Sequence, residues 1–159
     1  MSSSALNFIL LHLVANLFSL GGAEWWEADR AVDLARVWCE KGLASPRCSY
    51  QRLHAFRQAA ELDPGCLQAY LELGEAYYDL AIGYGHQDLF RQAAGALEAA
   101  ARLDPERAQA HYRLGTIYFF LKDFDRCRRE LETAHRIDPA FSPAAASLRL
   151  FETPRTTGK

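Results

Sequence analysis

The same short pattern recurs at three places in this 159-residue chain, where an aliphatic residue is followed by Asp-Pro. The dipeptides are Asp63-Pro64, Asp104-Pro105 and Asp138-Pro139; the last two prolines are 34 positions apart and the first two 41. Because proline disfavours helical geometry in the residue before it, each dipeptide predicts the end of a helix. A period of this length predicts stacked repeats that bury their apolar faces against one another.

Each Asp-Pro follows a spaced set of small, aromatic and aliphatic residues. In the third unit the set is Leu114, Gly115, Tyr118, Cys127, Leu131 and Ala134, and in the second it is Leu73, Gly74, Tyr77, Ala93, Leu97 and Ala100. The first unit matches more weakly, with Leu34, Ala35, Trp38, Gly42, Phe56 and Ala59. On these residues the chain resembles the tetratricopeptide repeat (TPR) family, whose period is about 34 residues.

The resemblance implies an all-α fold, a right-handed superhelical solenoid of helical hairpins. Three units are expected at residues 28–66, 67–107 and 108–141. A capping helix is expected at 142–152 and a flexible tail at 153–159. Seven extra residues near 81–87 are expected to add about one turn to each helix of the second unit, which preserves the packing phase. Five extra residues around 44–48 predict a longer loop in the first unit.

The N-terminal residues 1–23 are strongly hydrophobic, and residues 5–20 contain no charge. Three interpretations stay open. The segment is a membrane anchor with Trp25 and Trp26 at the interface, which places the repeats on the cytoplasmic side because Arg30, Arg36 and Lys41 follow it. Alternatively it is a secretory signal cleaved before Glu24, although its basic n-region is missing. The third interpretation is a structural helix that packs on the solenoid or on a partner.

No constellation for catalysis appears in the sequence: there is no nucleophile–base pair, phosphate-binding glycine loop or metal-ligand spacing. We therefore expect no enzyme activity, no cofactor, no metal and no small-molecule substrate. A formal net charge of −2 argues against nucleic-acid binding, which needs a basic surface. Cys39 and Cys48 are a candidate disulfide if the domain is exported, and free thiols otherwise.

The resemblance also implies where a partner would bind, because TPR proteins use a groove lined by the first helix of each unit. The expected groove residues are Val32, Arg36, Glu40, Gln68, Leu71, Glu75, Tyr78, Asp79, Gln109, Tyr112, Thr116, Phe119 and Phe120, with Asp29 and Cys39 also at groove positions. Their acidic excess suits an apolar or weakly basic peptide or helix. The cationic cluster that binds carboxylate tails in one TPR subclass is missing here.

The adjacent aromatic residues Phe119 and Phe120 have two interpretations. They form an exposed binding surface, or they pack against the final helix. The resulting functional prediction is non-catalytic protein–protein interaction, by a membrane-tethered scaffold, an assembly factor or an accessory subunit of a membrane complex. The alternative is an exported periplasmic or lumenal TPR protein that supports envelope assembly.

Overall fold

The structure of the protein is a computed structural model that describes residues 30–152. Within that range every regular element is a helix, which confirms the predicted all-α class. Residues 30–44 form the first helix. The helices that follow are α2 (Tyr50–Leu62), α3 (Leu67–Tyr84), α4 (Gln87–Leu103), α5 (Ala108–Phe120), α6 (Phe124–Ile137) and α7 (Ser142–Glu152).

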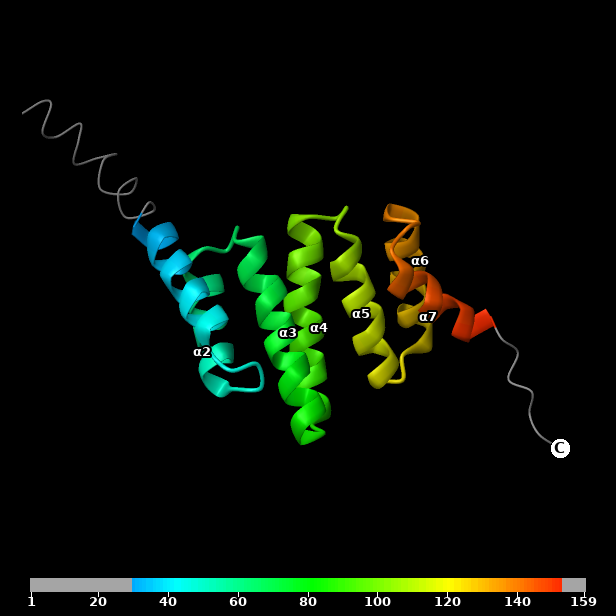
Figure 1. The fold of residues 1–159 in the computed structure, drawn as a ribbon, viewed down its shortest axis with the longest axis horizontal. Helices are drawn as coiled ribbons and strands as arrows, with labels where there is room; N and C mark the ends of the chain where they lie inside the picture. Colours follow the sequence, from blue (N-terminus) through cyan, green and yellow to red (C-terminus); the bar gives the residue numbers. More distant parts are fainter. Residues whose placement is uncertain (1–29, 153–159) are drawn as a thin grey trace, which may run out of the picture.

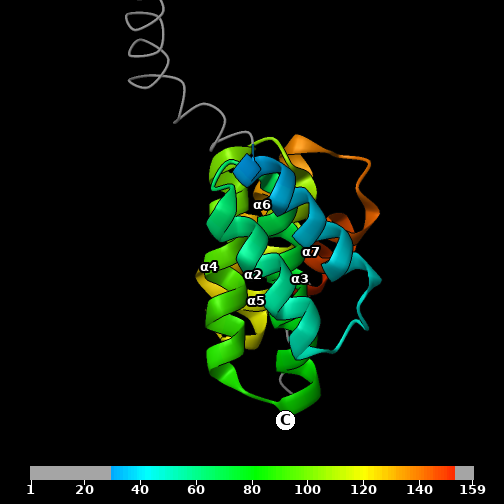
Figure 2. The ribbon, with the colours of Figure 1, turned by 90° about the vertical axis from the view of Figure 1, so that its left-hand side faces the viewer.

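The helices form antiparallel pairs that stand side by side in a row (Figure 1). Residues 30–44 pair with α2, α3 pairs with α4, and α5 pairs with α6, so that α7 follows the third pair. Viewed along the row, α4 lies on one side of the molecule and α3 and α7 lie on the other (Figure 2). We call the surface built by residues 30–44, α3, α5 and α7 the first-helix face.

Two adjoining apolar cores hold the row together. One core joins the first pair to α3 around Phe56, Leu73 and Leu80, and the other joins α3 and α4 to the third pair around Leu97 and Leu131. Alanines that are fully buried separate these larger side chains in both cores. Each pair therefore covers an apolar surface of its neighbour, as expected for a solenoid.

Close helix approach within a pair depends on glycine at one repeated position. A Cβ atom on Gly74 would lie 2.5 Å from Leu97 Cγ, and one on Gly115 would lie 2.8 Å from Leu131 Cγ. Such distances are shorter than van der Waals contact allows, so the leucine of the second helix occupies the space that a side chain would need. The same repeat position in α7 holds Arg149, 34 residues after Gly115. A second helix could not approach α7 as closely, which suits a capping helix.

The second pair is longer than the third, as the sequence predicts. Helices α3 and α4 have 18 and 17 residues, whereas α5 and α6 have 13 and 14. The hairpin tip of α3 and α4 consequently extends beyond the neighbouring tip, at the bottom of Figure 1. Gly85 closes α3 in the left-handed conformation (φ 71°), which glycine adopts without steric cost. The extra residues of the first unit form the loop 45–49, as predicted.

None of the helices within residues 30–152 is long and apolar enough to cross a membrane. The hydrophobic segment 1–23, Trp25, Trp26, the groove candidate Asp29 and the tail 153–159 lie outside the described residues.

Candidate protein-binding groove

The expected groove residues differ widely in how much of each side chain is exposed. Exposed members are Val32, Arg36, Glu40, Gln68, Gln109, Phe119 and Phe120, and half-buried members are Glu75, Tyr78, Asp79, Tyr112 and Thr116. Leu71 is buried in the core between the second and third pairs, and Cys39 is buried in the other core. These two assignments were wrong, because both side chains pack in the cores and only 9% of each residue is exposed.

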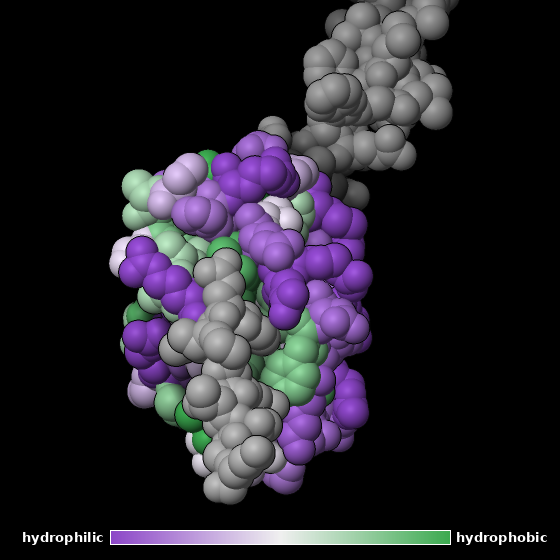
Figure 3. All heavy atoms as spheres, turned by 90° about the vertical axis from the view of Figure 1, so that its right-hand side faces the viewer, coloured by the Kyte–Doolittle hydropathy of each residue, from purple (hydrophilic) through white to green (hydrophobic). Residues whose placement is uncertain are grey.

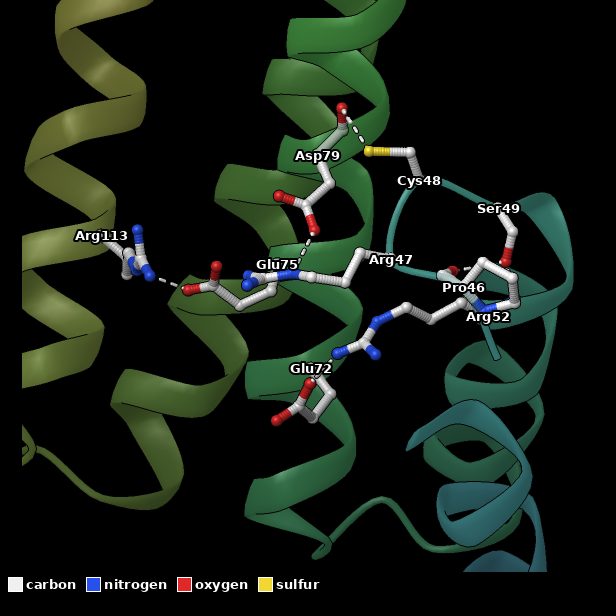
Figure 4. A network of polar contacts seen from close by, with 9 residues as sticks. All are labelled: Pro46, Arg47, Cys48, Ser49, Arg52, Glu72, Glu75, Asp79 and Arg113. Atoms are coloured by element: carbon white, nitrogen blue, oxygen red, sulfur yellow. Dashed lines mark hydrogen bonds and ion pairs between the residues drawn. The ribbon is translucent and has the colours of Figure 1, made fainter. Parts of the chain in front are cut away.

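Three acidic residues follow one face of α3, and each is paired with an arginine from a different element (Figure 4). Glu72 binds Arg52 of α2, with 2.5 Å between Oε2 and the guanidinium. Asp79 accepts a hydrogen bond of 3.3 Å from Arg47 Nε in the loop 45–49. We call this set the α3 ion-pair ladder; its third pair reaches α5.

The third pair of the ladder joins Glu75 to Arg113 of α5, with 2.5 Å between Oε1 and Nε. Burial raises the pKa of Glu75 above its usual range, and the guanidinium of Arg113 opposes that shift. The pair is shielded from water, since only 14% of the Glu75 side chain and 32% of the Arg113 side chain are exposed. The ladder thus connects the first, second and third units through a single helix.

The ladder changes the electrostatic interpretation of the groove. The acidic excess that the sequence predicts includes Glu75 and Asp79, and each of these two carboxylates is paired with an arginine. Arg47 illustrates the arrangement, because its side chain is 71% exposed while that of Asp79 is 16% exposed. The three ion pairs of the ladder therefore give the centre of the first-helix face no net charge.

Aromatic side chains gather at the end of α5. The Phe120 ring stacks on Phe90 of α4 with 4.9 Å between centroids and an interplanar angle of 6°. The edge of Tyr78 meets Phe120 at 5.9 Å. Phe120 thus joins α5 to the preceding pair. Despite this stack, 39% of the Phe120 side chain remains exposed.

Phe119 is oriented differently from its neighbour. Its side chain is 52% exposed, and its ring meets Phe124 of α6 edge-on at 6.0 Å. Phe124 is itself 44% exposed, so the two rings form an apolar surface at the hairpin tip of the third pair. Towards the C-terminal end, which Figure 3 faces, hydrophobic residues interrupt a mostly hydrophilic surface.

The cysteines do not form the candidate pair. All four are free thiols. Cys48 Sγ lies 3.9 Å from the carbonyl oxygen of Asp79, whereas Cys39 lies in the core beside Cys66. Burial raises the pKa of Cys39 to about 11, with Cys66 contributing further. Burial likewise raises the pKa of Cys127 to about 11, and this side chain lies in the core beside α5.

Nothing in residues 30–152 resembles a metal site, since no group of three His, Cys, Asp or Glu side chains is close enough to share an ion. His111 has a structural role: its Nδ1 lies 2.7 Å from Glu130 Oε2 and its Nε2 lies 3.1 Å from the Pro105 carbonyl oxygen. The ring therefore links the turn before α5 to helix α6.

Sequence reasoning missed the arginines of the ladder. Arg52 occupies the repeat position of the small residues Ala93 and Cys127, and this exception was the available signal. Arg47 lies in an enlarged loop whose path the repeat pattern does not specify. Arg113 has no neighbour in sequence that would reveal its partner, because Glu75 is 38 positions away.

Comparison with known proteins defines the class to which this architecture belongs. Residues 87–150, from the start of α4 into α7, match the tetratricopeptide repeat family. No curated protein sequence matched the chain.

Solved TPR structures share the arrangement. The Arabidopsis OM64 TPR domain is 18% identical, with a TM-score of 0.68 over 77% of this chain and 97% of that one. The first TPR of Spaghetti (RPAP3), bound to the HSP90 peptide SRMEEVD, is 20% identical, with a TM-score of 0.65 over 76% and 92%. TTC0263, a thermophilic TPR protein in Thermus thermophilus, is 24% identical, with a TM-score of 0.59 over 90% and 81%. The chain therefore has the TPR solenoid fold.

Proposed function

We propose that this protein is a non-catalytic scaffold that binds a peptide or helix of a protein partner along its first-helix face. The observation that carries the proposal is the aromatic surface at the end of α5, where Phe119 stays half exposed beside the packed Phe120. A large exposed aromatic side chain next to a rigid, satisfied surface is typical of a binding anchor. The peptide in the Spaghetti structure supports this class of function for the fold.

Rigidity provides the binding mechanism. Arginine–carboxylate pairs hold α2, α3 and α5 in register, so the groove side chains are ordered before a partner arrives. A preorganised surface loses little conformational entropy on binding, and most of the interaction free energy is retained as affinity. Because the centre of the face is close to neutral, it favours a segment that is mainly apolar with few charges.

The test uses the full chain and a library of random peptides displayed on phage. The affinity of a selected peptide is then measured for the double variant Gln68→Lys/Gln109→Lys, which adds two charges at exposed positions of the first-helix face. We expect at least a tenfold loss of affinity, since an apolar partner segment that covers these positions would remove the added charges from water without pairing them.

A matched control makes the same substitutions on the opposite side of the pairs. Gln51 and Gln92 are exposed on α2 and α4, so Gln51→Lys/Gln92→Lys should leave the affinity unchanged. Equal losses in the two double variants, or a loss only in the control, would contradict binding at the first-helix face.

The scaffold is further proposed to be tethered to a membrane through residues 5–23, on the cytoplasmic side, as an assembly factor or accessory subunit. The support is the uncharged apolar sequence of that segment. The intact mass of the native chain in membrane and soluble fractions tests the tether. A full-length chain confined to membranes is expected, whereas a soluble chain that begins at Glu24 would indicate export.

A further inference from the structure

An open-sided cavity of about 180 Å³ lies between α5 and α7, with α6 beneath it. We call it the α5–α7 pocket. Its lining consists of Tyr112, Gly115, Thr116, Phe119, Cys127, Leu131 and Ser147. Three of these residues, Tyr112, Thr116 and Phe119, are groove positions of the first-helix face, so the pocket opens from the surface that the proposed function uses.

The internal repeat explains why a pocket exists at this junction. At the preceding junction Glu75 of α3 and Arg113 of α5 meet in the half-buried ion pair of the ladder. The equivalent residues are Thr116, 41 positions after Glu75, and Ser147, 34 positions after Arg113. Two long charged side chains are thus replaced by two short hydroxyls. The volume that the ion pair occupies in one junction is open in the next.

The lining of the pocket defines what can enter. None of its seven residues carries a charge at neutral pH. The Thr116 hydroxyl donates a 3.0 Å hydrogen bond to the Tyr112 carbonyl oxygen, so its donor is already satisfied. A charged group that entered would lose hydration without meeting a counter-charge, which is unfavourable. The pocket therefore selects against Asp, Glu, Lys and Arg.

The size of the pocket further narrows the ligand. A cavity of about 150 Å³ in a protein core accepts a benzene molecule, so a slightly larger open-sided pocket accommodates one branched aliphatic or aromatic side chain. Phe119 lines the pocket with half of its side chain exposed, so an aromatic ring is available for contact with such a group.

We propose that the α5–α7 pocket receives one large uncharged side chain, Leu, Met or Phe, from a partner polypeptide that lies along the first-helix face. The inference rests on the proposed function and makes it specific. The pocket is the anchor site of the groove, and the ladder at the preceding junction is its closed counterpart.

The experiment restores the ion pair of the preceding junction in the full chain. Thr116→Glu/Ser147→Arg recreates the Glu75–Arg113 pair between α5 and α7 and fills the pocket. Peptides selected on the unmodified chain from a random phage library are expected to share one Leu, Met or Phe. Their affinity should fall at least tenfold in the double variant, as should the affinity of peptides in which that residue is replaced by Ala.

Two further variants keep the test decisive. Ser147→Leu fills the pocket without adding charge and should also reduce affinity, while its thermal midpoint stays equal to or above that of the unmodified chain. Ala140→Arg adds a charge at an exposed position outside the pocket and should bind peptide normally.

The outcomes separate this inference from the proposed function. If both filled variants fold and bind peptide with unchanged affinity while Gln68→Lys/Gln109→Lys loses it, the pocket inference is overturned and groove binding stands. If no variant of the first-helix face changes peptide affinity, the proposed function fails together with the inference.

Discussion

Arg52 shows how one residue can depart from a repeat and still fit the fold. Its side chain is 9% exposed and stands where the other units have Ala93 and Cys127. The guanidinium is accommodated because Glu72 accepts its hydrogen bond and the Phe56 ring lies 5.1 Å from its Cζ atom. Its Nε has no hydrogen-bond partner among the described residues, so the site is only partly satisfied. Removal of the paired carboxylate destabilises a protein far more when the arginine is buried than when it lies on the surface.

Two glycines of the second pair give a sharp contrast at the residue scale. We expect Gly74→Ala to reduce the free energy of unfolding by about 1–3 kcal/mol, because the new methyl group overlaps Leu97 in the core. Gly95→Ala should instead increase it by up to about 1 kcal/mol, because Gly95 lies within α4 with open space around it and alanine favours the helix.

Urea denaturation of the two glycine variants and the unmodified chain, followed by circular dichroism, measures both effects. If Gly74→Ala proved as stable as the unmodified chain, the close approach of Leu97 to α3 would not hold in solution.

At the scale of the elements, helix order and length could be predicted from the sequence, whereas contacts between helices could not. Repeat spacing indicates where helices end, and the insertion of seven residues preserves helical phase, so the sequence predicts that α3 and α4 are long. Which side chains contact each other across the first-helix face depends on the rotamers that long side chains adopt. Phe120 and Phe119 are adjacent in sequence, yet one stacks on Phe90 and the other stays half exposed. The repeat pattern contains no information on that difference.

The stack of Phe120 on Phe90 predicts a measurable coupling between α4 and α5. We expect Phe120→Ala to lower the free energy of unfolding by about 1–2 kcal/mol, since it removes a stacked ring contact between α4 and α5. Phe119→Ala should cost less, because half of that side chain already faces solvent, but it should weaken peptide binding more.

Thermal unfolding and peptide titration of the two phenylalanine variants separate the roles. The assignment would be reversed if Phe119→Ala were the less stable protein and Phe120→Ala the weaker binder.

For the whole molecule, the central pair is the best supported part of the row. Helix α3 packs against α2 and α4, and its acidic face reaches α2, the loop 45–49 and α5 through the ladder. Helix α7 has neighbours on one side only among the described residues, and it packs mainly on α6. In a solenoid each unit is stabilised by its immediate neighbours, so stability falls towards the ends.

Hydrogen exchange tests this gradient. We expect backbone amides in α3 and α4 to exchange most slowly and those in α7 to exchange at least tenfold faster, since local opening is easiest where fewest neighbours are lost. Mass spectrometry of peptides from the exchanged chain measures the order. Uniform protection along residues 30–152 would show that the row unfolds as one cooperative unit.

The unequal lengths of the hairpins also affect which molecular surfaces can contact the edge formed by the hairpin tips of the second and third pairs. Helix α3 has 18 residues and α5 has 13, and the tip of α3 and α4 extends beyond the tip of α5 and α6 in Figure 1. A flat surface that approached the edge would meet Tyr84 and its neighbours first and would be held away from Phe119 and Phe124. A narrow chain can reach those two rings by entering beside the step. The step therefore makes this edge uneven, so a broad flat surface cannot contact both hairpin tips at once.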